Sequence, residues 1–200
     1  YGNVPAAYLV CGGRSEGSSV VNLHDDIMVR LSSADRQNVA LAVNGGIASA
    51  GSVGTYMSVS HPAANANDGD VETEWCNSWS MPDWLKVEFD QAYLIDRVGV
   101  VWGIGTHNQT FSISLSADGN NWTTVVTSRS SATDAGYNGS EYHGNTTVSR
   151  ETFPITPMSA RFVKIDVTAS SAPQSHIFKA IVHELQAFRA NSTAPTITTS

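Results

Sequence analysis

The chain has 200 residues, of which 41% are hydrophobic and only 14% are charged, so it can bury one full core. Its formal net charge of −7 at pH 7 argues against binding nucleic acid or an anionic membrane through bulk electrostatics. The sequence contains no run of about eighteen apolar residues, so no membrane-spanning helix is expected.

Residues 1–37 form an N-terminal segment with a pattern of its own. The stretch Ala6–Val10 is compatible with a strand, and Asn22 is a suitable N-cap for a short helix that runs to Arg36. We interpret this segment either as the end of a preceding domain or as an extension packed on the domain that follows. Because the chain begins at Tyr1 without a recognisable signal peptide, we expect it to be a piece of a longer protein.

The two cysteines of the sequence, Cys11 and Cys76, leave their pairing open. They are compatible with one disulfide in a secreted protein, and also with two small buried apolar side chains. A disulfide would fasten the N-terminal segment to the residues after Trp75. In the chain-entropy view, closing a loop of that length stabilises a fold by about 4 kcal/mol.

Residues 63–75 concentrate acidic and hydroxyl side chains around Gly69 and end in a tryptophan. Calcium takes about six to eight oxygen ligands, and a glycine lets a short loop turn sharply enough to present several of them. The spacing differs from the helix–loop–helix calcium motif, which needs a bidentate glutamate at the end of its loop. The alternative is an acidic surface turn in which Asp68 and Asp70 only hydrogen-bond their own backbone.

Strand patterns follow this loop. In residues 84–89 polar and apolar side chains alternate, which places Leu85, Val87 and Phe89 on one face of a strand. Further strand-like segments lie at residues 94–102, 111–122, 160–165 and 183–188. The sequence therefore predicts a domain built of β-strands.

Six motifs carry a family resemblance, and they are A-x-D-G-D-x-x-T-x-W, W-L-x-V-x-F, I-D-R-V, S-x-D-G-x-x-W-T, A-R-F-V-K-I and E-L-x-x-F. In this order they resemble the discoidin domain, a group that includes the coagulation factor V/VIII type C domains and, closest to this chain, the bacterial family 32 carbohydrate-binding modules. The resemblance covers residues 38–190 and implies an all-β fold, a β-sandwich jelly roll of the galactose-binding-domain type. Residues 191–200 have the Thr/Ser-rich composition of an interdomain linker.

The resemblance also implies a structural calcium ion in the acidic loop. Side chains or carbonyl groups of five residues would hold it, namely Asn65, Asp68, Asp70, Thr73 and Glu184. Asn65 would contribute its carbonyl, Thr73 both its hydroxyl and its carbonyl, and Glu184 would reach the ion from the last strand. An ion held in this way ties the first and last strands together, so we expect a role in stability.

No catalytic motif emerges from the sequence. Glycoside hydrolysis usually needs two carboxylates that face a cleft, whereas the acidic residues here gather in the 63–75 loop or occupy exposed strand positions such as Glu88. The sequence has no nucleophile elbow, zinc-protease pair, phosphate-binding loop or dinucleotide fingerprint. Its six histidines have no metal-ligand spacing. We therefore expect a non-enzymatic module, although the larger protein can be a glycan-degrading enzyme.

A carbohydrate-binding module presents aromatic and polar side chains on loops at one end of a rigid sandwich. Sugar C–H groups pack on an aromatic face, and hydroxyls take hydrogen bonds from polar side chains. Trp79 lies in a loop without strand periodicity and is the expected stacking platform, whereas the other four tryptophans, Trp75, Trp84, Trp102 and Trp122, are expected in the core or the rim. The expected neighbours of Trp79 are His107, Asn108, Asn77, Tyr56 and Phe178.

The identity of the sugar stays open at this point. Galactose-binding members of the family usually carry an arginine and an asparagine in the loop after the I-D-R-V strand, and this chain has His107 and Asn108 there without an arginine. The acidic net charge favours neutral sugars, such as galactose-type glycans.

The sequence thus predicts a non-catalytic module that targets a larger secreted or cell-surface protein to glycans. Its expected partners are carbohydrate and other domains of the same chain, and neither nucleic acid nor a membrane. The alternative is a protein- or phospholipid-adhesion module, as among the coagulation and discoidin-receptor relatives. A third interpretation is a spacer domain that binds no ligand.

Overall fold

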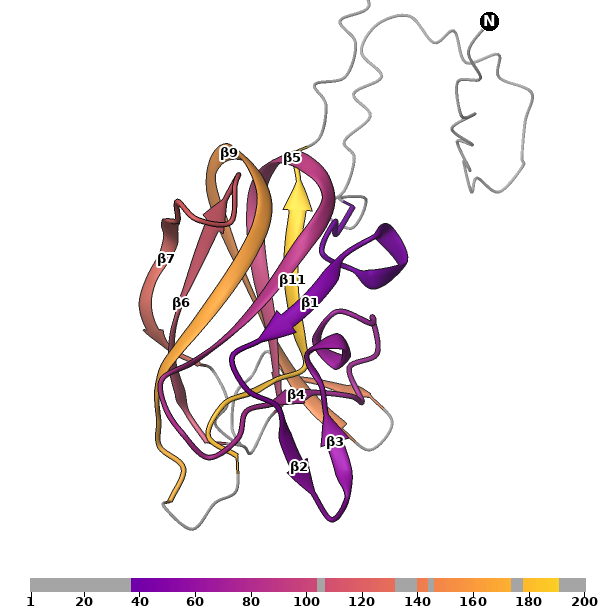
Figure 1. The fold of residues 1–200 in the computed structure, drawn as a ribbon, viewed down its shortest axis with the longest axis vertical. Helices are drawn as coiled ribbons and strands as arrows, with labels where there is room; N and C mark the ends of the chain where they lie inside the picture. Colours follow the sequence, from indigo (N-terminus) through magenta and orange to yellow (C-terminus); the bar gives the residue numbers. More distant parts are fainter. Residues whose placement is uncertain (1–36, 104–106, 132–139, 144–145, 174–177, 191–200) are drawn as a thin grey trace, which may run out of the picture. The chain divides into compact units, whose positions relative to one another are not determined.

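The computed structural model describes residues 37–103, 107–131, 140–143, 146–173 and 178–190, and this part of the chain is mostly β-strand (Figure 1). The only helical turns among these residues are η2 (Ala42–Asn44) and η3 (Ala63–Ala66). None of the described helical segments is long and apolar enough to cross a membrane. The expected strand and helix before residue 37, Cys11 and the 191–200 tail lie outside the described residues.

Eleven strands make up the described fold, and all pair antiparallel. They are β1 (Ile47–Ala50), β2 (Gly54–Tyr56), β3 (Val59–His61), β4 (Trp75–Cys76), β5 (Asp83–Gly103), β6 (Gln109–Ser116), β7 (Thr123–Ser130), β8 (Ser140–His143), β9 (Thr146–Ser170), β10 (Ile181–Val182) and β11 (Glu184–Arg189). The main sheet has the order β1-β5-β9-β6-β7, with β11 on β5 and β8 on β9. Two small sheets, β4–β10 and β2–β3, complete the fold.

The long strands β5 and β9 belong to both layers of the sandwich. Residues 83–88 of β5 pair with residues 162–167 of β9, and on either side of this pair lie β1 and β6. Beyond a register shift after Glu88, the second half of β5 pairs with the first half of β9 and with β11. Both ribbons curve over near the upper end in Figure 1, so the sheet folds back on itself into two layers.

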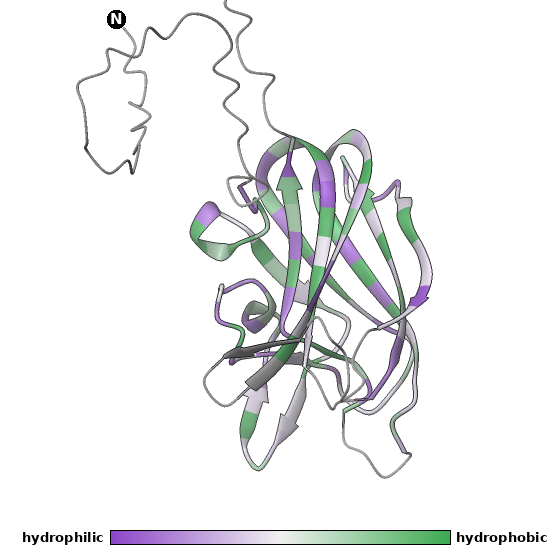
Figure 2. Cartoon of the chain, turned by 180° about the vertical axis from the view of Figure 1, so that it is seen from behind, coloured by the Kyte–Doolittle hydropathy of each residue, from purple (hydrophilic) through white to green (hydrophobic). Residues whose placement is uncertain are grey.

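The core lies between these layers. Leu85, Val87 and Phe89 are fully buried, as the alternation in residues 84–89 predicts, and the colours along the long strands in Figure 2 show the same alternation. Trp75 and Trp102 are also fully buried. Burying a large apolar side chain contributes about 1.5–3 kcal/mol, so this cluster supplies the main driving force for the fold.

One prediction about the strands needs correction. The sequence pattern separates residues 84–89 from residues 94–102, whereas the structure has a single bent strand, β5, over Asp83–Gly103. Asp90, Gln91 and Ala92, between the two patterns, are exposed at the bend. A polar stretch of this kind is typical of a loop in the sequence, but backbone pairing on both sides of it keeps the strand continuous.

Candidate functional site

Three oxygen atoms of the acidic loop meet around the Thr73 hydroxyl. The Thr73 Oγ1 atom lies 2.8 Å from Asp68 Oδ2, 3.0 Å from the Asp70 carbonyl oxygen and 3.2 Å from the Asn65 carbonyl oxygen. A hydroxyl has one proton and cannot donate to all three acceptors. The cluster therefore holds more acceptor oxygens than donors, which is the composition that a hard cation needs.

Glu184, at the start of β11, brings a buried carboxylate to the same loop. Its Oε1 atom accepts a hydrogen bond of 2.8 Å from the Gly69 backbone N–H, whereas its buried Oε2 atom has no hydrogen-bond partner among the described residues. Burial raises the pKa of the Glu184 carboxyl to about 7, and the neighbouring charge of Asp68 raises it further, against the Gly69 hydrogen bond. A buried, half-partnered carboxyl beside a second carboxylate is the electrostatic situation that a bound cation would relieve.

The expected role of Asp70 changes in detail. Its Oδ1 atom accepts the Glu72 N–H at 2.9 Å, so its carboxylate holds the turn, while its carbonyl oxygen faces Thr73. The Asp68 carboxylate both holds the turn and faces the oxygen cluster, because its Oδ1 atom accepts the Asp70 N–H and its Oδ2 atom faces Thr73. Gly69 has φ of +89°, which a side chain rarely adopts, and so permits the turn. The loop is thus a self-bonded acidic turn and also an oxygen cluster that fits calcium.

A second group of metal-ligating side chains lies nearby and was not anticipated. His61 Nδ1 and Glu74 Oε1 are 2.9 Å apart, and the Cys76 thiol completes a group whose ligand atoms all lie within 4.8 Å of one another. Burial raises the pKa of the Cys76 thiol, so it stays protonated at neutral pH. The three residues come from β3, the loop before β4 and β4 itself, so no sequence spacing indicates the group.

Trp79 stands on the loop between β4 and β5. Its side chain is 63% exposed, and its backbone has φ of +49°, a conformation that costs a non-glycine residue energy and persists where the surroundings fix it. The neighbouring Asn77 supplies this support. The loop therefore holds a large aromatic side chain outward.

Asn77, one of the expected sugar contacts, has a structural role in the Trp79 loop. The side chain is fully buried, and its Oδ1 atom accepts the backbone N–H groups of Lys179 and Ala180 at 2.9 and 2.8 Å. Its Nδ2 atom donates to the Ser80 carbonyl at 2.7 Å. Asn77 thus ties the Trp79 loop to the segment before β10 and has no surface left for a ligand.

The rings of Tyr56 and Phe178 contact each other. Their ring centroids lie 6.5 Å apart in an edge-on arrangement, and the His61 ring lies 5.0 Å from Phe178. A Cβ atom added to Gly54 would lie 2.5 Å from the Phe178 ring and 2.6 Å from the Asn77 carbonyl oxygen. The β2–β3 hairpin therefore packs closely on Phe178 and on the base of the Trp79 loop.

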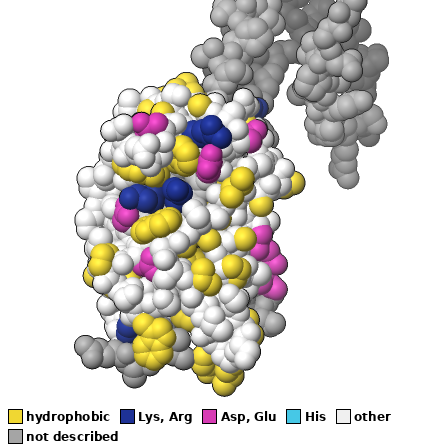
Figure 3. Space-filling model, in the orientation of Figure 1, with side chains coloured by type: hydrophobic (Ala, Val, Ile, Leu, Met, Phe, Trp, Pro, Cys, Tyr) yellow, Lys and Arg dark blue, Asp and Glu magenta, His cyan; other side chains and the backbone are white. Residues whose placement is uncertain are grey.

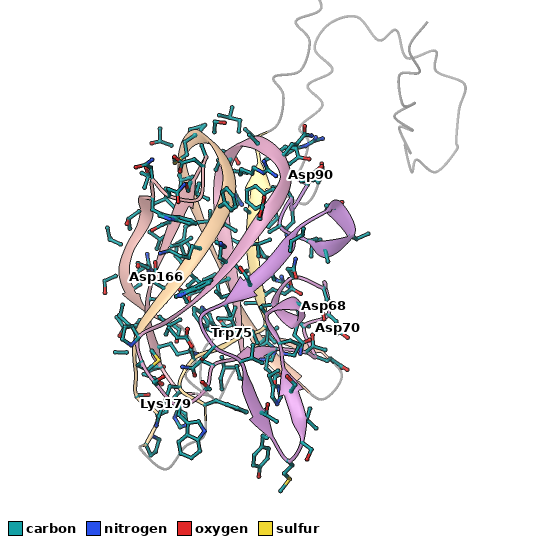
Figure 4. All side chains as sticks on the ribbon, viewed as in Figure 1. Asp68, Asp70, Trp75, Asp90, Asp166 and Lys179 are labelled. Carbon is teal, nitrogen blue, oxygen red and sulfur yellow. The ribbon has the colours of Figure 1, made fainter. Side chains whose placement is uncertain are left out.

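Asn108 and Lys179 are both hydrogen-bonded to residues 171–173, which follow β9. Asn108 exchanges two bonds with Ser171, through its N–H at 2.9 Å and its carbonyl at 2.8 Å. Lys179 donates from Nζ to the Ala172 and Pro173 carbonyls. Figure 4 shows Lys179 near the lower end of the molecule, away from Asp68 and Asp70 beside η3. His107, next to Asn108, is half-buried.

The family assignment follows from a comparison of the sequence with models of protein families, in which residues 48–180 match the F5/8 type C domain. The chain belongs to this family. The resemblance inferred from the six motifs is therefore confirmed for an F5/8 type C domain. A search of curated protein sequences gave no match.

Solved structures share the fold of this F5/8 type C domain. The Clostridium perfringens module CpGH89CBM32-5, in complex with GalNAc-beta-1,3-galactose, is 20% identical with a TM-score of 0.56, covering 72% of this chain and 94% of that one. Chitosan-binding module 1 of a chitosanase/glucanase from Paenibacillus sp. IK-5 is 20% identical with a TM-score of 0.55, covering 76% and 98%. A pectin-binding module is 23% identical with a TM-score of 0.55, covering 80% and 94%.

These similar structures are carbohydrate-binding modules of the β-sandwich type, and family 32 modules are among them. The predicted fold class, an all-β sandwich, is thus confirmed. The expectation of a binding module rather than a catalytic domain agrees with these neighbours. The individual sugar-contacting and metal-binding residues stay predictions.

Proposed function

We propose that this F5/8 type C domain is a non-catalytic carbohydrate-binding module whose sugar site is built around Trp79. The observation that carries the proposal is the exposure of Trp79 on a loop fixed by the buried Asn77 side chain. An exposed, pre-positioned indole offers a sugar ring a flat apolar surface without an ordering cost on binding. The carbohydrate ligands named for the similar modules support this choice of ligand class.

Four further residues define what the proposed site would recognise. Tyr56 and Phe178, whose rings meet edge-on, would supply aromatic walls, and His107 and Asn108 would supply hydrogen-bonding groups for sugar hydroxyls. Because the chain carries a net charge of −7, this loop site should favour neutral sugars of the galactose type. A shallow site of this kind binds a sugar with a free energy of about −4 to −6 kcal/mol. The module therefore contributes a weak contact that adds to those made by its partner domains.

The proposal includes a structural calcium ion in the acidic loop. The residues that would hold it are Asp68, Thr73 and Glu184 through side chains, and Asn65 and Asp70 through carbonyl oxygens. The unpartnered buried oxygen of Glu184 and the excess of acceptors around Thr73 support this assignment. The ion would supply positive charge that joins the loop to β11.

In a larger secreted or cell-surface protein, such a module would act by targeting. Holding the rest of the chain on a glycan raises its local concentration there without any new contact to the substrate. This role needs only that the sugar site faces outward from the sandwich, as Trp79 does.

Calorimetric titration with galactose, N-acetylgalactosamine, glucose and mannose oligomers tests the proposal. Trp79→Ala should weaken the binding of the preferred sugar about tenfold, because it removes the stacking surface. The matched control is Leu94→Ala, which shortens another exposed apolar side chain, on β5 near its bend, and should leave affinity unchanged. Equal affinity of wild type and Trp79→Ala would contradict the proposed site. Binding to phosphatidylserine vesicles in place of sugars would favour the adhesion alternative.

A further inference from the structure

The outer face of the β5–β9 pair carries a second candidate site, which differs from the loop site in its residues and in its local charge. Trp84 and Lys86 on β5, Lys164 on β9 and Trp122 before β7 line a shallow hollow of about 160 Å³. All four side chains are half-buried, and none of them is acidic. Figure 3 shows Lys and Arg side chains gathered with hydrophobic ones on this face of the molecule.

The two lysines stand directly opposite each other in the strand register. Lys86 of β5 pairs with Lys164 of β9 in the antiparallel ladder. Like charges in that position repel each other and destabilise a sheet. The Lys164 ammonium has an ion pair with Asp166 at 3.0 Å, whereas Lys86 has none among the described residues. The other acidic side chain of this face, Glu88, pairs with Arg161 at 3.0 Å.

Aromatic rings lie around both lysines, and of the two only Lys164 also has an acidic partner in the described part of the chain, Asp166. The Lys86 ammonium lies 5.7 Å from the ring centroids of both Trp84 and Phe162. The Lys164 ammonium lies 4.9 Å from the ring centroid of Trp122. These cation–π contacts hold the two ammonium groups in place. The Lys86 ammonium donates no hydrogen bond among the described residues, and the Lys164 ammonium keeps donors beyond the one that faces Asp166.

We propose that this hollow is a second carbohydrate site, selective for acidic sugars, in which a uronate carboxylate lies between Lys86 and Lys164. A carboxylate there would relieve the repulsion of the lysines and accept charge-assisted hydrogen bonds from both. The pyranose ring of the same sugar unit would pack its C–H groups on Trp84 or Trp122. The combination of two ammonium groups with two indole surfaces fits a charged sugar better than a small inorganic anion, which has no apolar face.

The acidic net charge of the chain does not prevent this binding. At physiological ionic strength, charges more than about 8 Å apart are largely screened. Among the residues that the structure describes at the hollow, the two lysines outnumber the one carboxylate beside them, that of Asp166, so the local charge stays positive. The site is separate from the proposed Trp79 site, since it lies on the strands and uses none of the loop residues. Its failure and the failure of the proposed function can therefore be told apart.

Affinity electrophoresis and calorimetry of the full chain with oligogalacturonate test the proposal. The double variant Lys86→Met/Lys164→Met keeps the apolar stems and removes both charges. It should bind oligogalacturonate at least about tenfold more weakly, since one charge-assisted contact is typically worth that factor. The variant removes the opposed charges and also the partly exposed Lys164–Asp166 ion pair, which is a weak contribution to stability. Its melting temperature should therefore change little, so that lost binding is not lost folding. Binding by the wild type should weaken with added salt.

Two controls make the result specific. Trp79→Ala should leave oligogalacturonate binding unchanged, whereas the lysine double variant should leave neutral-sugar binding unchanged. Polyglutamate offers carboxylates without pyranose rings and should bind much more weakly than oligogalacturonate. The proposal is overturned if the wild type does not bind oligogalacturonate, if the double variant binds it equally well, or if polyglutamate binds equally well.

Discussion

At the start of β11, Glu184 combines deep burial with incomplete hydrogen bonding. One carboxyl oxygen accepts the Gly69 N–H, and the other has no hydrogen-bond partner among the described residues. In the metal-free chain this arrangement favours the neutral carboxyl, and the pKa of Glu184 rises from 4.5 to about 7, mainly through burial. A calcium ion would reverse the preference, since it binds the charged form.

This pKa shift makes the stability of the metal-free chain depend on pH. Between pH 4.5 and about 7 the folded chain keeps the Glu184 proton that the unfolded chain loses, so stability falls as pH rises through this window. The loss from this group amounts to at most about 3 kcal/mol. Thermal melts in chelator at pH 5 and pH 8 should show it in the wild type and not in Glu184→Gln.

A matched control for this experiment is Glu72→Gln, which neutralises an exposed carboxylate in the same loop. It should keep the pH dependence of the wild type, because the buried Glu184 carboxyl is unchanged in this variant. If Glu184→Gln and the wild type lose the same stability between pH 5 and pH 8 in chelator, the Glu184 carboxyl is not the group responsible.

At the scale of elements, the β2–β3 hairpin sets the shape of the proposed sugar site. Its turn residues Met57 and Ser58 both have positive φ, as a tight two-residue hairpin turn requires. At the base of the hairpin, Gly54 lies against the Phe178 ring and the Asn77 carbonyl. The absence of a side chain at Gly54 lets the hairpin, Phe178 and the Trp79 loop pack together.

Gly54→Ala should therefore damage both stability and sugar binding. The added Cβ atom would lie 2.5 Å from the Phe178 ring and 2.6 Å from backbone, so the hairpin must move away. Such overpacking typically costs about 1–3 kcal/mol of stability. Denaturant unfolding and sugar titration measure the two effects. The control is Thr55→Ala, which shortens an exposed side chain on the same strand and should alter neither stability nor sugar affinity. A Gly54→Ala variant with normal sugar affinity would show that the hairpin does not shape the sugar site.

Some features of the strands and loops can be predicted from local sequence, and others depend on distant parts of the chain. Alternation in residues 84–89 predicts the buried face of β5, because that information is local. The role of Asn77 was missed, since nothing local indicates that its amide is buried against Lys179 and Ala180, about a hundred residues away. The opposed lysines likewise depend on the register of β5 against β9, which a single strand pattern does not contain.

At the scale of the whole molecule, the acidic loop joins distant parts of the chain. Its oxygen cluster spans residues 65–73, and Glu184 comes from the final strand, β11, which pairs with the second half of β5. An ion held by both parts binds the folded chain and not the unfolded one. Its binding energy therefore adds to the stability of the entire sandwich.

Removing calcium should lower the melting temperature of the wild-type domain. At a free concentration one hundred times the dissociation constant, a ligand adds about 2.7 kcal/mol, which corresponds to roughly 5–10 °C for a domain of this size. Asp68→Ala removes a proposed calcium ligand, so this variant should melt at the lower temperature with or without chelator. The matched control is Asp118→Ala, because Asp118 holds a similar Asp-Gly turn through the N–H groups of Asn120 and Asn121, away from the oxygen cluster. That variant should still respond to chelator, and a wild type whose melting curve ignores exhaustive chelation would rule out a calcium contribution to stability.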